Sequence, residues 1–524
     1  MPKNRTYILT LLFLVACGGG GGGSSETTPT VSVAPTPPPA PSPSTFEELK
    51  ADFEGYYEYR RHWGLKSVNS SSAHARGATG AGITIGITDS GLDVTHVEID
   101  QTRISSNSDL EYSNYVPSTK QKRHGTMVTS IAAGTLDKTA QSPMHGVAFN
   151  SQVLFVAIQL SDPDPEYDPI DLGDTDSSGD VTNADNLAAE FAGIDNFFSS
   201  LFEFYNFYDA DIVNNSYGFA GNIIDYTESQ VRTAFPKTIA EMSQIDTPDE
   251  DKTIYVWAAG NAGSYADQGV NYFHPELLPG MAYFIEEIQG HSIAVVSVDE
   301  DGQISDFSSM CGVSRNYCIA APGGSVNVAY PTSSDDYGIY PSDKTDPNYN
   351  SCVEDNSCYA AAGGTSFAAP FVTGGLAVMA EYFEGQLGNT ELVNRLFTTA
   401  NKSGVYNNPE IYGHGLMDLA AATSPVGQVS AMLGQNLYGP MTSAEFTSIH
   451  LTNPSFGDSI SRGLNNKSVI FFDELLAPFR RPLSGIISNY GNQITELIKY
   501  LDTQLSNIEN INFNELSQTI QNSI

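Results

Sequence analysis

The chain has 524 residues, of which 40% are hydrophobic, so it is long and apolar enough to bury a large core. It carries 61 Asp and Glu against 24 Lys and Arg, a formal net charge of −37 at pH 7. Binding to nucleic acid requires a basic surface, so this composition argues against a nucleic-acid partner. The charge favours solubility but says nothing about the fold.

The N-terminal segment 1–17, MPKNRTYILTLLFLVAC, has the pattern of an export signal. Lys3 and Arg5 precede an apolar stretch that is too short to span a membrane. The residues LVAC resemble the processing box of bacterial lipoproteins, which predicts lipid attachment at Cys17 and a membrane as partner. The alternative is an ordinary signal peptide with an incidental cysteine.

Residues 18–45 are rich in Gly, Pro and Ser and contain almost no apolar side chains to bury. This composition predicts a tether between the lipid and a folded domain, or else a plain disordered leader. We therefore expect an exported protein at the outer membrane or cell surface, with a periplasm-facing protein as the alternative.

From residue 46 to about residue 425 the composition is globular, with short apolar runs that end at glycine or polar residues. Such runs are typical of strands buried on both faces, and helix-like segments lie between some of them. Strand–helix repetition predicts an α/β fold whose mostly parallel sheet is flanked by helices on both faces. The runs are 82–89, 152–158, 210–216, 253–261 and 291–298, and the clearest helical segments are 124–133 and 187–205.

The stretch DTDSSGDVTNAD has carboxylates and a hydroxyl at nearly the spacing of a calcium-binding loop. Its candidate ligands are Asp174, Asp176, Ser178, Asp180 and Asp185, the last standing where such loops usually carry Glu. The alternative is a solvated acidic loop. Calcium is thus a candidate structural ion, and we expect no cofactor to be required for chemistry.

Four polar residues follow or interrupt these elements: Asp89 in ITDSG, His124 in HGTMV, Asn261 in AAGN and Ser366 in GTSFAAP. Each alone has an ordinary interpretation as a turn former, a structural histidine or a helix cap. Their order and contexts together resemble the subtilisin-like serine protease family, including lipoprotein and autotransporter-type bacterial members.

The resemblance implies a serine endopeptidase that acts on proteins or peptides. Ser366 would be the nucleophile, His124 the base and Asp89 its orienting partner, with Asn261 in the oxyanion hole. It also implies two walls of the primary specificity pocket, with Tyr217 placed to narrow its mouth. The walls are Asn214, Ser216, Tyr217 and Gly218 on one side, and Ala258, Ala259 and Gly260 on the other. The alternative is a protein that keeps the fold but binds peptides or partners without cutting them.

Four cysteines remain after Cys17, an even number that suggests two disulfides in an exported protein. Three pairings are open, and we favour the local one, Cys311 with Cys318 and Cys352 with Cys358. A metal site is the alternative, although the spacings lack the close pairs of zinc sites.

Residues 426–524 form a C-terminal extension. The stretch VIFFDELLAPFRRP, residues 469–482, resembles segments that precede the outer-membrane barrel of autotransporter subtilases, but residues 483–524 are too few for a barrel and we expect none. Apolar residues recur there at helical spacing, namely Ile494, Ile498, Leu501, Leu505 and Ile508. They predict an amphipathic helix packed on the domain or a linker, with self-association as the alternative.

Overall fold

The computed structural model describes residues 45–111, 115–138, 142–160, 166–244, 252–332, 352, 355–383, 386–432, 443–445 and 468–482. The predicted signal, lipidation site, most of the tether and the predicted C-terminal helix lie outside these residues. Within them, no helix combines the length and the apolar character needed to cross a membrane.

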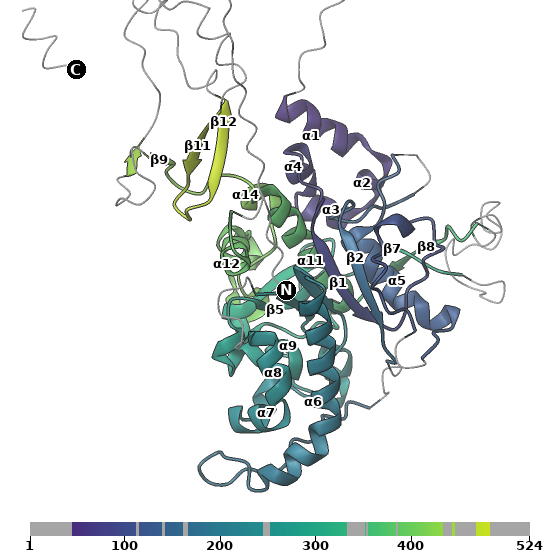
Figure 1. Cartoon of the computed structure of the whole chain (residues 1–524), viewed down its shortest axis with the longest axis vertical. Helices are drawn as coiled ribbons and strands as arrows, with labels where there is room; N and C mark the ends of the chain where they lie inside the picture. The colour runs from purple at the N-terminus through teal and green to yellow at the C-terminus, as the bar shows by residue number, and fades with distance from the viewer. Residues whose placement is uncertain are drawn as a thin grey trace, which may run out of the picture. The chain divides into compact units, whose positions relative to one another are not determined.

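A six-stranded parallel sheet in the order β2-β1-β3-β4-β5-β6 forms the centre of the fold (Figure 1). The strands are β1 (Thr84–Asp89), β2 (Gln152–Ala157), β3 (Ile212–Asn215), β4 (Ile254–Ala258), β5 (Ser292–Val298) and β6 (Cys318–Pro322). Five of them confirm the apolar runs expected from the sequence. β6 was not predicted, because CIAAP has few of the β-branched residues that mark a buried strand.

Successive side chains of these strands enter different cores, as the two-residue period of a strand requires. On β2, Val153 and Phe155 belong to one apolar cluster, whereas Leu154 and Val156 belong to another. Helices α5 and α11 supply the first cluster, and α6, α7 and α8 supply the second. The α/β fold with helices on both faces is therefore confirmed.

The helices are α1 (Phe46–Gly55), α2 (Tyr57–Arg61), α3 (Trp63–Ser67), α4 (Ser70–Ala75), α5 (Thr119–Ala133), α6 (Ala184–Phe207), α7 (Glu228–Ala234), α8 (Pro236–Ser243), α9 (Leu277–Gly280), α11 (Thr365–Phe383), α12 (Asn389–Thr399), α13 (Pro409–Tyr412) and α14 (Leu419–Ala422). An antiparallel pair, β7 (Val326–Ala329) and β8 (Tyr359–Ala362), leads into α11.

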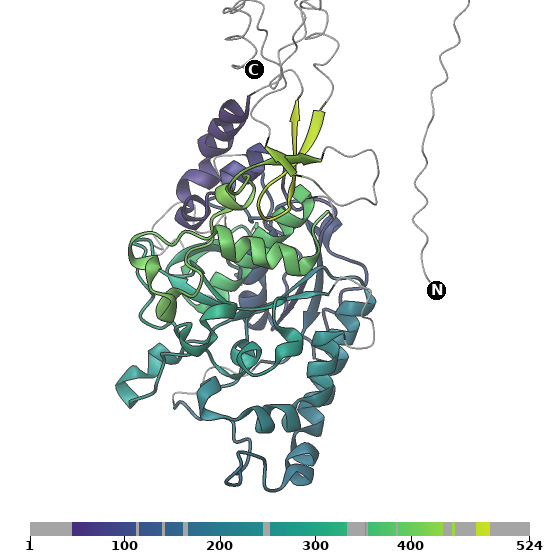
Figure 2. The same ribbon diagram turned by 90° about the vertical axis from the view of Figure 1, so that its left-hand side faces the viewer.

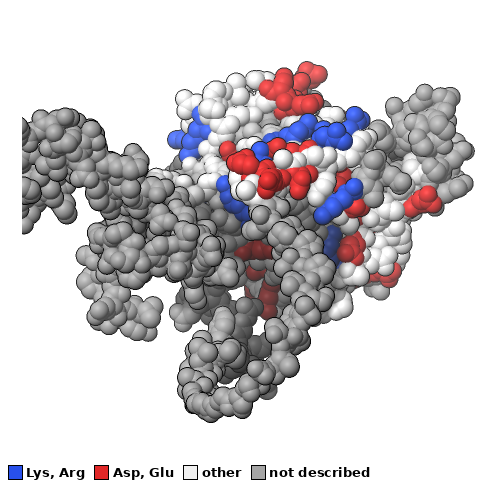
Figure 3. All heavy atoms as spheres, turned by 90° about the horizontal axis from the view of Figure 1, so that it is seen from above, with Lys and Arg blue, Asp and Glu red and all other residues white. Residues whose placement is uncertain are grey.

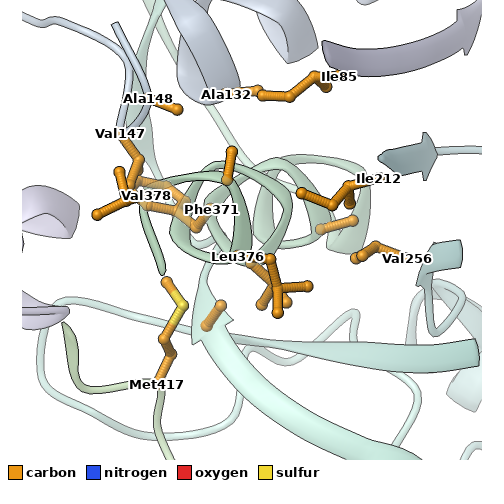
Figure 4. Packing of buried hydrophobic residues seen from close by; sticks show 14 of the residues in the cluster. Ile85, Ala132, Val147, Ala148, Ile212, Val256, Phe371, Leu376, Val378 and Met417 are labelled. Carbon is orange, nitrogen blue, oxygen red and sulfur yellow. The ribbon is translucent and has the colours of Figure 1, made fainter. Parts of the chain in front are cut away.

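Helix α11 is largely enclosed in the first cluster, with Phe371, Leu376 and Val378 fully buried. Figure 4 shows these side chains surrounded by residues from the sheet and from α5, among them Ile85, Ile212, Val256 and Ala132. Because α11 is apolar around most of its circumference, it can be covered on every side, which suits a helix inside a core rather than on its surface.

The described part of the C-terminal extension consists of strands, namely β9 (Ser430–Met432), β10 (Ser443–Glu445), β11 (Ser468–Phe472) and β12 (Pro478–Pro482). The β11–β12 hairpin (yellow in Figure 2) is joined to the main domain by Asp473, which accepts a hydrogen bond from Arg395 at 2.7 Å. Both side chains are almost completely buried, and the Arg395 guanidinium also lies over the rings of Phe383 and Phe479. Through Asp473, Ala477 and Phe479, this hairpin packs against the main domain.

The structure contains the two local disulfides, Cys311–Cys318 and Cys352–Cys358. The first connects the 3₁₀ helix Gly312–Tyr317 to the start of β6. The pairing favoured from the sequence is therefore the observed one.

On the face of the molecule shown in Figure 3, Lys and Arg side chains are interspersed with Asp and Glu side chains. Among the described residues in this view, the basic side chains form no continuous surface. This agrees with the acidic composition, although it tests no partner directly.

Candidate active site

Asp89 is the last residue of β1 and lies at the carboxyl edge of the sheet, where parallel α/β folds collect their functional groups. Its side chain is fully buried. The backbone N–H of Ser90 donates to Asp89 Oδ1 at 2.6 Å, and the Ser90 hydroxyl donates to the same oxygen at 3.2 Å. These bonds hold the carboxylate in one orientation.

His124 is presented to Asp89 by α5, which begins several residues earlier than the sequence pattern predicted. Ser118 and Gln121 form a reciprocal capping box at its start, a motif that the sequence STKQ contains and that marks a helix N-terminus. Gly125 lets this helix approach β1, because a Cβ atom there would lie 2.2 Å from the carbonyl oxygen of Gly91. His124 Nδ1 is consequently 2.8 Å from Asp89 Oδ1 and 3.0 Å from Oδ2.

The electrostatics of this pair set the behaviour of the imidazole. Burial lowers the pKa of His124, but the charge of Asp89 and the hydrogen bond to it outweigh burial, so the net pKa lies above the ordinary value of 6.5. About 34% of the His124 side chain remains exposed, in contrast to the enclosed Asp89. The ring therefore has one side fixed by the carboxylate and another open to a ligand.

Ser366 is the second residue of α11, and the ring of the next residue, Phe367, lies 5.5 Å from the ring of His124. The Ser366 hydroxyl donates to the carbonyl oxygen of Ser216 at 3.2 Å, not to the imidazole. In return, the Ser216 hydroxyl donates to the carbonyl oxygen of Ser366 at 2.8 Å. The start of α11 is thereby held against the segment that follows β3.

Asn261 follows β4 and is tied to the residue just before the serine. Its Oδ1 accepts hydrogen bonds from the backbone N–H and the hydroxyl of Thr365, both at 3.0 Å. With the oxygen engaged in this way, the amide NH₂ group is the end of the side chain left to face a ligand. The structure therefore brings Asn261 and Ser366 together from elements far apart in the sequence.

Hydrogen bonds and a ring contact to neighbouring residues hold one of the segments expected to form the pocket walls. Asn214 donates to the Ser216 hydroxyl at 2.9 Å and accepts from Thr373 on α11 at 3.0 Å. Tyr217 donates to Asn215 at 2.8 Å, and its ring stacks on that of Phe198 in α6. The ring is thus engaged by α6, and its role at the pocket mouth stays a prediction.

One residue beside these walls escaped the sequence analysis. Glu276 precedes α9 in the sequence HPELLPG, and its side chain lies against both Gly218 and Gly260. The only sequence signal was an acidic residue at the entrance to an apolar run, which is also the usual sign of a helix start.

The acidic loop offers the calcium hypothesis no added support. The Ser178 hydroxyl donates to Asp176 at 2.5 Å and to Asp180 at 2.8 Å, so the loop is tied by its own side chains. Among the described residues, no three His, Cys, Asp or Glu side chains gather closely enough to hold a metal ion. Calcium binding stays a prediction.

A model of the subtilase family matches residues 80–415. This range includes Asp89, His124, Asn261 and Ser366. The chain belongs to the subtilase family. Its α/β fold and the order of Asp89, His124 and Ser366 along the chain are those expected of a subtilase.

Several subtilase relatives are similar over most of the domain. An extracellular serine protease of Serratia marcescens is 26% identical over 402 residues, 70% of this chain and 34% of the relative. The thermostable alkaline protease of Halalkalibacterium halodurans is 25% identical, over 69% of this chain and 73% of the relative. Serotype-specific antigen 1 of Mannheimia haemolytica is 32% identical over 33% of this chain and 16% of its own length. This subtilase thus spans about a third or less of the Serratia and Mannheimia proteins.

Among solved structures, MycP1 from Mycobacterium smegmatis matches with a TM-score of 0.46 at 18% identity, covering 74% of this chain and 89% of MycP1.

Proposed function

We propose that this subtilase is an exported serine endopeptidase that hydrolyses peptide bonds with Asp89, His124 and Ser366, assisted by Asn261. The observation that carries the proposal is the 2.8 Å contact between His124 Nδ1 and Asp89. Further support is the position of Ser366 at the start of α11, directly before Phe367, whose ring lies 5.5 Å from that of His124. A hydroxyl is a weak nucleophile until a base accepts its proton, and we assign His124 as that base.

In the proposed reaction, the Ser366 oxygen attacks the scissile carbonyl carbon while His124 Nε2 takes the hydroxyl proton. The carboxylate of Asp89 keeps the other ring nitrogen protonated and stabilises the imidazolium that forms. His124 then donates the proton to the leaving amine, and water releases the acyl group by the same steps in reverse order.

The negative charge that develops on the substrate oxygen needs donors that are already in place. The amide of Asn261 and the backbone N–H of Ser366 meet this need, because Thr365 holds the Asn261 oxygen and so fixes the direction of its NH₂ group. The N-terminus of α11 adds its partial positive charge at the same point.

The hydrogen bond from Ser366 to Ser216 favours a second candidate, a subtilase fold that binds peptides without cutting them. Catalytic hydrogen bonds in sites without substrate are often long and tighten on binding, so this bond is compatible with an active enzyme as well. The proposed reaction requires the Ser366 side chain to turn its hydroxyl from Ser216 toward the imidazole.

The deciding experiment compares the purified protein with its Ser366→Ala variant on a diverse peptide library. We expect cleavage by the first alone, blocked by a serine-directed phosphonyl fluoride, with a loss in the variant on the order of 10⁶-fold in kcat. Equal product patterns from the two proteins would refute the assignment of Ser366. Peptide binding without cleavage by either protein would favour the second candidate.

We further propose that Cys17 carries a lipid and that residues 18–45 tether the domain to the outer membrane or cell surface. The support is the sequence LVAC at the end of the apolar segment and the polar, Pro-rich chain after it. Cys17→Ser should move the protein from the membrane fraction of cells to the soluble fraction. An unchanged distribution of the variant would refute the anchor.

A further inference from the structure

The side chain of Glu276 lies between the two segments proposed as walls of the specificity pocket. A Cβ atom built on Gly260 would lie 2.3 Å from Glu276 Cδ, and one built on Gly218 would lie 3.5 Å from its Oε2. Glycine at both positions therefore leaves the carboxylate access to the space between the walls. The residue is partly exposed, as a group that lines a binding site must be.

Glu276 is also fixed close to the reacting groups. Its backbone N–H donates to the carbonyl oxygen of Ala259 at 2.9 Å, and its carboxylate accepts a hydrogen bond from the backbone N–H of Asn261. The carboxylate is thus held by the same short segment that supplies the proposed oxyanion donor. A substrate side chain entering between the walls would meet it directly.

Among the residues that the structure describes, the Glu276 carboxyl group has no cationic partner. Burial raises the pKa of Glu276 to about 8, because the charged form is costly without a counter-ion. A cationic side chain placed beside this carboxyl group would favour its charged form and lower that pKa, so binding of a cation and loss of the proton would go together.

We infer that Glu276 selects substrates with Arg or Lys at the residue whose carbonyl is cleaved. The long apolar stem of either side chain would pass between Ser216–Gly218 and Ala258–Gly260, and its charged end would reach the Glu276 carboxylate. Acidic side chains at the same substrate position would be rejected, because they would place two carboxyl groups together. The inference rests on the proposed function, since it concerns the same site.

The test uses the purified full chain and peptide pairs that differ only at this substrate residue. Arginine is compared with citrulline, which has nearly the same shape without the charge, and glutamine is compared with glutamate. We expect kcat/KM to favour arginine over citrulline about 10- to 100-fold, the range of a hydrogen bond between charged groups. We expect glutamine to be preferred over glutamate.

Glu276→Gln removes the charge while keeping an acceptor for Asn261, and it should bring both ratios close to one. Glu286→Gln is the matched control, because Glu286 is exposed and lies outside the walls, so its ratios should equal those of the natural chain. The control also accounts for the general attraction of cationic peptides to an acidic protein.

Equal cleavage of the arginine and citrulline peptides by the natural chain would overturn the inference, and so would cleavage restricted to apolar residues. Both results leave the endopeptidase function standing, whereas absence of cleavage of every peptide would refute that function first. If Glu276→Gln fails to fold, as melting would show, the ratios of the natural chain still decide the question.

Discussion

Asp89 and Asp473 are both buried aspartates, and each lies within 2.7–2.8 Å of a nitrogen on a basic side chain. Their partners differ in two respects. His124 can lose its charge near neutral pH and is about one third exposed, whereas Arg395 keeps its charge and is 1% exposed. The first pair can exchange a proton with a substrate, and the second can only hold two parts of the chain together.

The two pairs also differ in how their contribution to stability depends on pH. The folded-state pKa of His124 is raised, so its pair contributes stability fully below the unfolded value of about 6.5 and loses it as pH rises through the folded value. The neutral imidazole that catalysis needs therefore appears only as this contribution is lost. Arg395 keeps its charge over this pH range, so the Arg395–Asp473 pair does not lose its contribution to stability in this way.

The largest expected effect comes from breaking the first pair. Asp89→Asn should lower kcat about 10⁴-fold, because an amide at this position favours the wrong imidazole tautomer and cannot stabilise the imidazolium. Stability should change little, since an asparagine oxygen can still accept from the Ser90 N–H. Kinetics on a cleaved peptide, together with thermal melting, would check both statements, and a melting loss that matches the activity loss would contradict them.

The same variant sharpens the comparison through its pH profile. In the natural chain kcat/KM should fall about tenfold per pH unit below the raised pKa of His124, as the base becomes protonated. Removing the charge of Asp89 removes the attraction that raises this pKa, so the acid limb should move to lower pH. An acid limb at the same pH in both proteins would mean that another group controls it.

Breaking the second pair should have the opposite outcome. Asp473→Ala would leave the buried guanidinium of Arg395 without its counter-charge and should cost about 3–5 kcal/mol of unfolding free energy. The kcat of the molecules that remain folded should be unchanged, because neither Arg395 nor Asp473 is one of the proposed catalytic groups. Denaturant unfolding and active-site titration would measure the two quantities.

The control for this variant is Glu474→Ala, since Glu474 is the exposed neighbour on the same turn. Glu474→Ala should lower the free energy of unfolding by less than about 1 kcal/mol, as for most exposed charged groups. If Asp473→Ala costs no more than the control, the hairpin is not anchored by this pair.

The sequence was most informative where one short pattern fixes a local structure. The apolar run 82–89 predicted β1 with Asp89 at its carboxyl end, because such a run is typical of a strand buried on both faces. The start of α5 was placed too late, although Ser118 and Gln121 carry the capping signal that would have placed it. The contexts around His124 and Ser366 predicted that these two residues act together, and the ring of Phe367, next to Ser366, lies 5.5 Å from that of His124.

Long-range packing could not be predicted from the sequence, because the residues that make these contacts belong to no recognisable local sequence pattern. Glu276 acquires its position from glycines 16 and 58 residues earlier in the chain, and an isolated glutamate before Leu277 reads as a helix start. Asp473 in the same way looks like a turn residue until Arg395 is placed against it. Neither contact follows from periodicity or composition.

The helix that begins at Thr365 carries Ser366 and has most of its side chains buried in the core. Elements of this kind usually open only when the whole domain unfolds. A molecule that has started to melt would therefore not keep Ser366, the proposed nucleophile, in place. Heated samples should lose the proposed peptidase activity and their compactness in one step.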